Sequence, residues 1–222
     1  MSTVVERTER LTGTPAAPRW RGRLHLFALA LAVPTAAALV WHNPAPEAAL
    51  YAVALVALFA VSTAYHLLPL SPARRHLLRR ADHATIYLYI AAAYGPYCHW
   101  AVRGALGWVV LGVVWTGAGL GVAVKGLDFR RTHAFSGVLY LVLGWTAVIT
   151  LPRAGRVLDG VDLGLLVTMG ALYTAGAAVL ARRRPDPAPL VFGYHEVWHA
   201  AVVLATACYV VVVWRLTGPS FA

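Results

Sequence analysis

The amino-acid sequence predicts an all-α protein: a seven-transmembrane helix bundle with a cytoplasmic N-terminus and an extracytoplasmic C-terminus. Three observations predict this fold, namely a charge-poor composition, seven long apolar runs, and an uneven distribution of basic residues among the connections. Of the 222 residues, 59% are hydrophobic and only 13% are charged. A soluble domain carries about 25% charged residues, so the composition favours a membrane protein.

Seven runs of the sequence contain almost no charged side chain, and Glu196 in the last run is their one acidic residue. Each run is close to the ~20 residues that a helix needs to cross ~30 Å of hydrocarbon. Lipid offers the backbone no hydrogen-bond partners, so each run is expected to form a helix rather than an open strand. The runs are Leu24–Trp41, Ala48–Leu68, Ala84–Trp100, Ala105–Val124, Ala134–Leu151, Leu163–Ala181 and Val191–Trp214.

The connections between the runs are short, so residues 24–216 are expected to form one transmembrane domain. Residues 1–23 are polar and rich in arginine, and we expect them to be a disordered basic cytoplasmic tail. Residues 217–222 would form a short outer tail. A cleavable signal peptide is the alternative for the first run, and cleavage would leave six helices. The run exceeds the usual ~7–15 apolar residues of such a signal, however.

Connections that are rich in basic residues alternate along the chain with connections that are poor in them, and this alternation sets the predicted orientation. Four of the 19 basic residues, namely Arg103, Arg153, Arg156 and Arg215, fall on one side, and the rest fall on the other. Positive charge accumulates in cytoplasmic loops, so the richer side is expected to be cytoplasmic. The net charge of +10 is therefore interpreted as a preference for anionic lipid headgroups and not for nucleic acid. The richer side holds Arg7, Arg10, Arg19, Arg21, Arg23, Arg74, Arg75, Arg79, Arg80, Lys125, Arg130, Arg131, Arg182, Arg183 and Arg184.

Three histidines lie where one metal ion can bind them. His195 and His199 are four residues apart in the seventh run, so they project from one face of a helix. His66 lies near the end of the second run, and the predicted orientation places all three in the cytoplasmic half of the membrane. Three protein nitrogens and a water form the open tetrahedral pattern of catalytic Zn²⁺ sites. The alternative for each histidine is a hydrogen-bonded packing role.

Asp82 and Ser62 are the predicted catalytic partners of this site. Zinc lowers the pKa of bound water, and Asp82 near the start of the third run would accept the proton. Ser62 precedes His66 by one helical turn and would orient the water or a substrate carbonyl. The alternatives are an ion pair with a neighbouring arginine for Asp82 and a bond to its own helix for Ser62.

Glu196 allows two interpretations. In soluble metalloproteases the glutamate of His-Glu-x-x-His is the general base. Here it can instead be a hydrogen-bond partner of a ligating histidine. Five further histidines, His25, His76, His83, His99 and His133, lie near the predicted interfaces and are interpreted as contacts with water or lipid headgroups.

With these residues in place, the sequence resembles the hemolysin III family, the bacterial branch of the progestin and adipoQ receptor (adiponectin receptor-like) proteins. The resemblance covers nearly all of residues 20–216. The matching elements are Ser-x-x-x-His at 62–66, Asp-His-x-x-Ile-Tyr at 82–87, a Gly-x-Tyr-x-Pro-like element ending at Pro96, Tyr-x-x-x-Gly-Trp at 140–145 and His-Glu-x-x-His at 195–199.

The resemblance implies a seven-helix zinc protein of the bacterial cell membrane, with His66, His195 and His199 as ligands and Asp82 beside the metal-bound water. It also implies kinship with alkaline ceramidases, which hydrolyse lipid amides. The leading hypothesis is therefore a zinc-dependent hydrolase of a lipid amide or ester that acts in membrane-lipid homeostasis, with a membrane lipid as substrate or ligand. The alternatives are a receptor-like or regulatory membrane protein with structural zinc, and a pore-forming cytolysin. The oligomeric state is not predicted.

Overall fold

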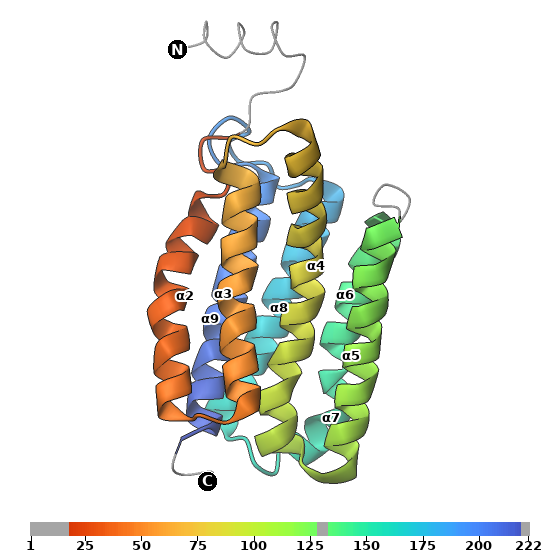
Figure 1. The fold of residues 1–222 in the computed structure, drawn as a ribbon. Helices are drawn as coiled ribbons and strands as arrows, with labels where there is room; N and C mark the ends of the chain where they lie inside the picture. The colour runs from red at the N-terminus through yellow and green to blue at the C-terminus, as the bar shows by residue number, and fades with distance from the viewer. Residues whose placement is uncertain (1–17, 128–132, 219–222) are drawn as a thin grey trace, which may run out of the picture.

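The computed structural model describes residues 18–127 and 133–218, which form a bundle of long helices that run alongside one another (Figure 1). The described residues contain no strand, so the all-α prediction is confirmed. The helical elements are α2 (Arg23–His42), α3 (Pro46–Leu67), α4 (Pro72–Pro96), the π-helix η1 (Tyr97–Val102), α5 (Gly104–Leu127), α6 (His133–Trp145), α7 (Ala147–Ala154), α8 (Gly160–Arg182) and α9 (Tyr194–Leu216).

Each predicted apolar run coincides with one helix or with two consecutive helical segments. The third run forms the end of α4 together with η1, and the fifth forms α6 and α7. Among the described residues, six helical segments have the length and hydropathy of a membrane span. Helix α4 is not one of them, because the four arginines of its first turns lower its mean hydropathy. The six segments are Arg23–His42, Pro46–Leu67, Gly104–Gly126, Ser136–Ala154, Gly160–Arg182 and Tyr194–Leu216.

Local signals in the sequence account for where several helices begin. Helix α3 begins at Pro46 and α4 at Pro72, because proline fits the first helical position, where no backbone donor is needed. Asp159 precedes α8 and accepts hydrogen bonds from the backbone N–H groups of Asp162 and Val161, both at 2.9 Å. The bond from the Asp162 backbone, together with the weaker effect of Arg215, holds the pKa of the Asp159 carboxyl below its usual range.

Neighbouring helices pack in an order that brings the two ends of the chain together. Helix α3 packs between α2 and α4, α5 packs on α4, and α9 packs on α8 and also against α2 (Figure 1). Large apolar side chains such as Phe27, Val53 and Val167 face outward, while Tyr51 and Tyr87 are buried in the interior. A surface of this kind suits a helix bundle surrounded by lipid, where apolar groups need no cover.

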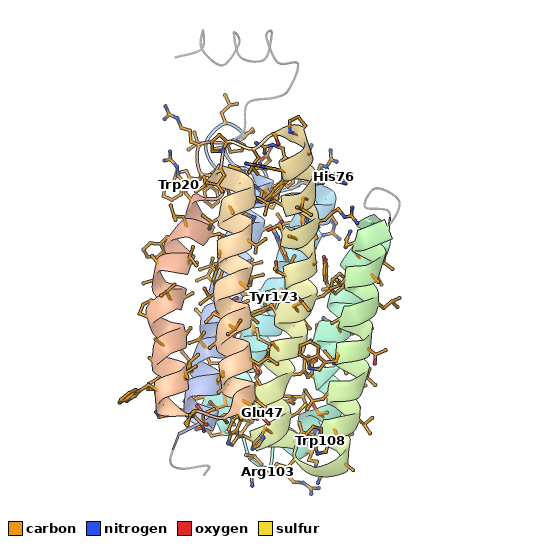
Figure 2. The ribbon with its side chains drawn as sticks, viewed as in Figure 1. Trp20, Glu47, His76, Arg103, Trp108 and Tyr173 are labelled. Atoms are coloured by element: carbon orange, nitrogen blue, oxygen red, sulfur yellow. The ribbon has the colours of Figure 1, made fainter. Side chains whose placement is uncertain are left out.

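Segments that are distant in the sequence share each end of the bundle. One end holds residues 18–22, the start of α4 and the end of α8, and Figure 2 shows Trp20 and His76 there. The opposite end holds Glu47, Arg103 and Trp108 (Figure 2). Basic residues of the predicted cytoplasmic connections thus gather at one end of the fold.

Residues 18–22 differ from the expected disordered tail, since they form an ordered turn. The backbone N–H groups of Arg19 and Trp20 donate to the carbonyl groups of Leu190 and Val191, at 3.0 Å each. The first described segment is therefore fastened to the loop that precedes α9. The remainder of the predicted tail, 1–17, and residues 219–222 lie outside the described residues.

Small residues let α5 approach its neighbours closely. A Cβ atom on Gly121 would lie 2.4 Å from the ring of Tyr87 in α4, and one on Gly117 would lie 2.5 Å from the side chain of Leu143 in α6. Gly119, on another face of the same helix, has no atom within 4 Å of the position that a Cβ would occupy. Close contact between membrane helices depends on such residues.

We predict that Gly121→Ala destabilises the fold by about 1–3 kcal/mol, because the buried ring of Tyr87 would have to move. The matched control Gly119→Ala should change stability little. Thermal unfolding of the detergent-solubilised variants measures both effects. Equal midpoints for the two variants would contradict the predicted close packing of α4 and α5.

Candidate metal centre

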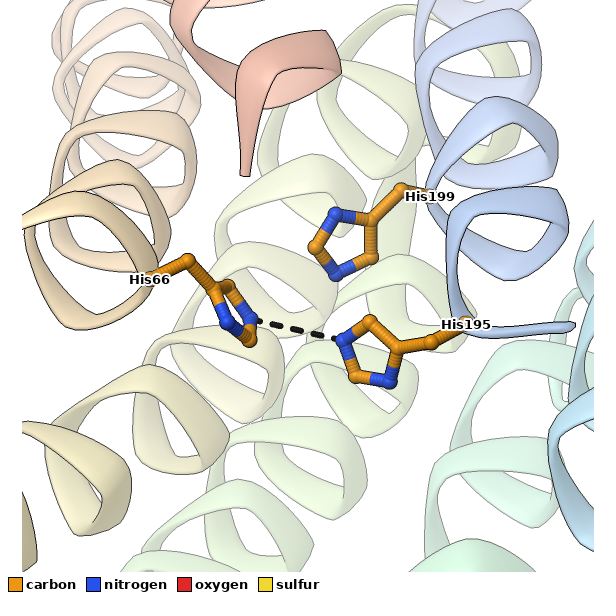
Figure 3. A group of neighbouring side chains, drawn as sticks. All are labelled: His66, His195 and His199. Carbon is orange, nitrogen blue, oxygen red and sulfur yellow. Dashed lines mark hydrogen bonds between the residues drawn. The ribbon is translucent and has the colours of Figure 1, made fainter. Parts of the chain in front are cut away.

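The structure brings together the three histidines that the sequence selects. His66 lies in the last turn of α3, and His195 and His199 lie in the first two turns of α9. One ring nitrogen from each lies within 4.8 Å of the others. Figure 3 shows the three rings around a common space, with a dashed line joining His66 and His195. The site therefore joins two helices that are far apart in the sequence.

The distance between two of these nitrogens matches that at a tetrahedral metal ion. The Nε2 atoms of His66 and His195 are 3.4 Å apart. Two nitrogens that each lie ~2.0–2.1 Å from a tetrahedral zinc ion are separated by about 3.3–3.4 Å. Three imidazole nitrogens also suit copper, iron and nickel. The donor set and the His66–His195 distance thus suit a transition metal ion, and three protein ligands would leave one tetrahedral position for water or a substrate.

The start of α9 fixes the two histidines that this helix contributes. The backbone N–H of Gly193 donates to Glu196 Oε2 at 2.9 Å, and that of Tyr194 donates to Asp186 Oδ1 at 2.8 Å. These bonds satisfy donors that the first turn of a helix leaves without partners. The first turn is therefore well defined, and His195 and His199 lie one above the other on the same face.

Glu196 has a role that the motif alone did not predict. It is fully buried, and its Oε1 atom accepts a hydrogen bond from Arg21 Nε at 2.6 Å, while Oε2 caps α9. The two interpretations from the motif, general base and partner of a ligating histidine, stay predictions. What the structure shows is an ion pair that fastens the segment before α2 to the first turn of α9.

That segment lies directly against the metal-ligand candidates. Gly22 has a φ of +76°, a conformation that glycine adopts without steric cost. A Cβ atom at this position would lie 2.6 Å from the Cβ of His66. Residues 18–22 therefore cover His66 from the end of the bundle, and the glycine permits this close approach.

Ser62 and Asp82, the predicted catalytic pair, lie near each other in the structure. Ser62 is buried one turn before His66, and Asp82 is close enough for the two side chains to interact. The Ser62 Oγ atom lies 2.8 Å from His25 Nδ1. Asp82 Oδ2 lies 3.5 Å from His83 Nδ1. Ser62 thus links α3 to α2, and the catalytic roles of Ser62 and Asp82 stay predictions.

His25 was predicted to contact water or lipid headgroups, and this prediction is wrong because the side chain is buried inside the bundle. It is 4% exposed, and its ring stacks on that of His199 with centroids 3.8 Å apart and planes 5° apart. The missed signal is a stripe of small and apolar residues with helical spacing that begins at His25. The buried residues of α2 are His25, Ala28, Ala32, Ala36 and Leu39.

The other four histidines that were assigned to the interfaces differ in exposure. His76 is exposed. His99 is half-exposed, and its Nδ1 atom forms a hydrogen bond with Glu47 Oε1 at 2.9 Å, at the end of the bundle opposite the metal-ligand candidates. His83 is partly buried, with Nδ1 2.9 Å from the carbonyl of Arg79. The side chain of His133 lies outside the described residues.

The fold and the site together define an all-helical, multi-pass membrane protein with a three-histidine candidate metal centre. A family model described as haemolysin-III related matches residues 15–210, so the chain belongs to this family. The predicted resemblance is confirmed, and so is the location in the bacterial cell membrane.

Three relatives show the breadth of the family. "Hemolysin-3" of Bacillus cereus is 32% identical over 157 residues, which cover 71% of this chain and 68% of that protein. The "Hemolysin-3 homolog" of Bacillus subtilis (strain 168) is 28% identical over 158 residues, or 71% of each chain. The human "Monocyte to macrophage differentiation factor" is 23% identical over 174 residues, or 75% of this chain and 68% of that protein.

We predict that Glu196→Gln lowers stability by about 1–3 kcal/mol while metal binding is retained. The amide oxygen can still cap α9, but the amide NH2 then faces the donor Arg21 Nε–H, so the charged hydrogen bond is lost. Thermal unfolding and metal analysis of the purified variant measure the two effects. Loss of the metal at unchanged stability would instead indicate that Glu196 acts at the metal.

Proposed function

We propose that this protein is a zinc-dependent hydrolase that cleaves an amide or ester bond of a membrane lipid and acts in membrane-lipid homeostasis. The observation that carries this proposal is the three-histidine cluster, whose ring nitrogens lie within 4.8 Å of one another, with Ser62 and Asp82 nearby. Structural zinc sites generally have four protein ligands, whereas catalytic sites keep one position open. Three histidines in the described residues support the catalytic type.

Zinc bound here would supply a Lewis acid that polarises a carbonyl and acidifies water near neutral pH. The protein's own residues would do the rest. His66, His195 and His199 would hold the ion through neutral imidazoles. Asp82 would accept the proton from water and later return it to the leaving group. Ser62 would donate a hydrogen bond to the Asp82 carboxyl and so fix its position.

The proposal includes seven membrane crossings, with α4 and η1 as the crossing that hydropathy alone does not select. Helix α2 begins at one end of the bundle and α9 ends at the other, which supports an odd number of crossings (Figure 1). The basic end would face the cytoplasm. The metal centre lies toward this end, where residues 18–22 cover His66. The lipid substrate would therefore enter sideways from the inner leaflet, between helices.

A second candidate is a receptor-like or regulatory membrane protein in which zinc is structural. One observation favours it: His66 and His195 are 129 residues apart, so the ion would tie α3 to α9. Removal of zinc would then lower thermal stability strongly, and no lipid would be turned over. Release of dye from liposomes by the zinc-free variant His66→Ala, at the wild-type rate, would instead support a cytolytic role.

We predict that the purified wild type contains about one zinc ion per chain, and that the double change His195→Ala and His199→Ala removes it. Metal analysis by mass spectrometry measures the content directly. His99→Ala, at the other end of the bundle, serves as the control and should retain the ion. A double variant with the metal content of the wild type would exclude the proposed ligands.

We predict that Asp82→Asn lowers turnover of labelled ceramides and acylated lipids about 10²–10⁴-fold while zinc remains bound, because the amide cannot accept the proton. Asp159→Asn is the matched control, since Asp159 caps α8 at the opposite end. If the zinc-loaded wild type and His195→Ala were equally inactive on all these lipids, the hydrolase proposal would fail.

A further inference from the structure

A fourth imidazole, that of His25, lies beside the three ligand candidates and has no role in the proposed function. The ring of His25 lies between two others: it stacks on His199, and it meets Phe59 edge-on with centroids 5.2 Å apart. Its Nδ1 atom contacts Ser62. We propose that His25 is a positioning residue that holds the ring of His199 by stacking and the hydroxyl of Ser62 by a hydrogen bond. The Ser62 part rests on the proposed function, while the His199 part rests on metal binding alone.

His199 needs such support because its other ring nitrogen lacks the usual partner. A histidine that ligates a metal through one nitrogen commonly donates a hydrogen bond from the other, and this bond fixes the orientation of the ring. The Nδ1 atom of His199 is buried without a hydrogen-bond partner in the described part of the chain. The nearly parallel ring of His25, with planes 5° apart, is the contact that can fix the plane of His199 instead.

The hydrogen bond between His25 and Ser62 suits the proposed function. An ionised Asp82, which the proposed function requires, can only accept hydrogen bonds. If Ser62 gives its one hydroxyl proton to such a bond, its oxygen can accept from His25 Nδ1–H across the 2.8 Å contact. In the proposed site His25 would thus donate to Ser62, and Ser62 would donate to Asp82.

His25 is the point where three helices meet at the site. It belongs to α2, its stacking partner belongs to α9, and its hydrogen-bond partner belongs to α3. A single side chain therefore couples a metal ligand to the residue that fixes the proposed proton acceptor. Its two contacts can be removed separately, because phenylalanine keeps a ring that can stack and asparagine keeps a donor near the position of Nδ1.

The test uses the full-length protein in detergent, with folding checked by circular dichroism. Zinc affinity is measured by competition with a chromophoric chelator, and ligand geometry by the visible absorption of the Co²⁺-loaded protein. We expect His25→Asn to weaken zinc binding about 10–100-fold and to shift the Co²⁺ bands. His25→Phe should keep zinc affinity within about threefold and leave the bands unchanged. His42→Asn is the control, since His42 stacks on Trp214 far from the site.

Wild-type affinity and Co²⁺ bands in folded His25→Asn would overturn the proposal. If His25→Phe weakened zinc binding as much as His25→Ala does, the proposal would also be overturned. His25→Phe alone decides the question if His25→Asn does not fold. In the turnover assay, zinc-loaded His25→Phe should be at least about tenfold slower than the wild type, because Ser62 loses its donor. A wild type that turns over no lipid would refute the proposed function, whereas the metal measurements would still decide the role of His25.

Discussion

Imidazole groups are costly to bury in a membrane protein unless their nitrogens have partners, and this cost organises one end of the bundle. His66, His195 and His199 face one another from two helices, with two of their nitrogens only 3.4 Å apart. In the absence of metal, one of these two nitrogens can carry a proton and donate a hydrogen bond to the other. A metal ion would satisfy all three at once. Such an ion would therefore stabilise the approach of His66 on α3 to His195 and His199 on α9.

The surroundings of the histidines restrict their movement from several directions. Glu196 fixes the first turn of α9 and accepts a hydrogen bond from Arg21, so the two histidines on α9 and the segment before α2 are held by one carboxylate. Gly22 brings that segment against His66. Metal sites retain their geometry only when the groups around the ligands are themselves held. Here a capped helix, an ion pair and a close glycine contact provide this support.

The sequence predicted those features that depend on composition and local spacing. Long apolar runs identified the helices, because lipid leaves the backbone no alternative to helical hydrogen bonds. Three features required the tertiary structure. The role of Glu196 depends on Arg21, which is 175 residues away. Burial of His25 depends on the direction in which α2 faces. Helix α4 joins the bundle although its arginines lower its hydropathy, because its later residues are buried between helices.

The covering segment also determines which terminus tolerates an attachment. The chain enters the described fold at residue 18, next to His66 and the first turn of α9, whereas α9 ends at the opposite end of the bundle (Figure 1). A purification tag or fluorescent protein joined directly before residue 18 would sit beside the histidines and compete with the contacts of Arg21 and Gly22. A tag joined after α9 would be separated from the histidines by the full length of a membrane helix. Fusions after α9 therefore leave the contacts of the histidines undisturbed.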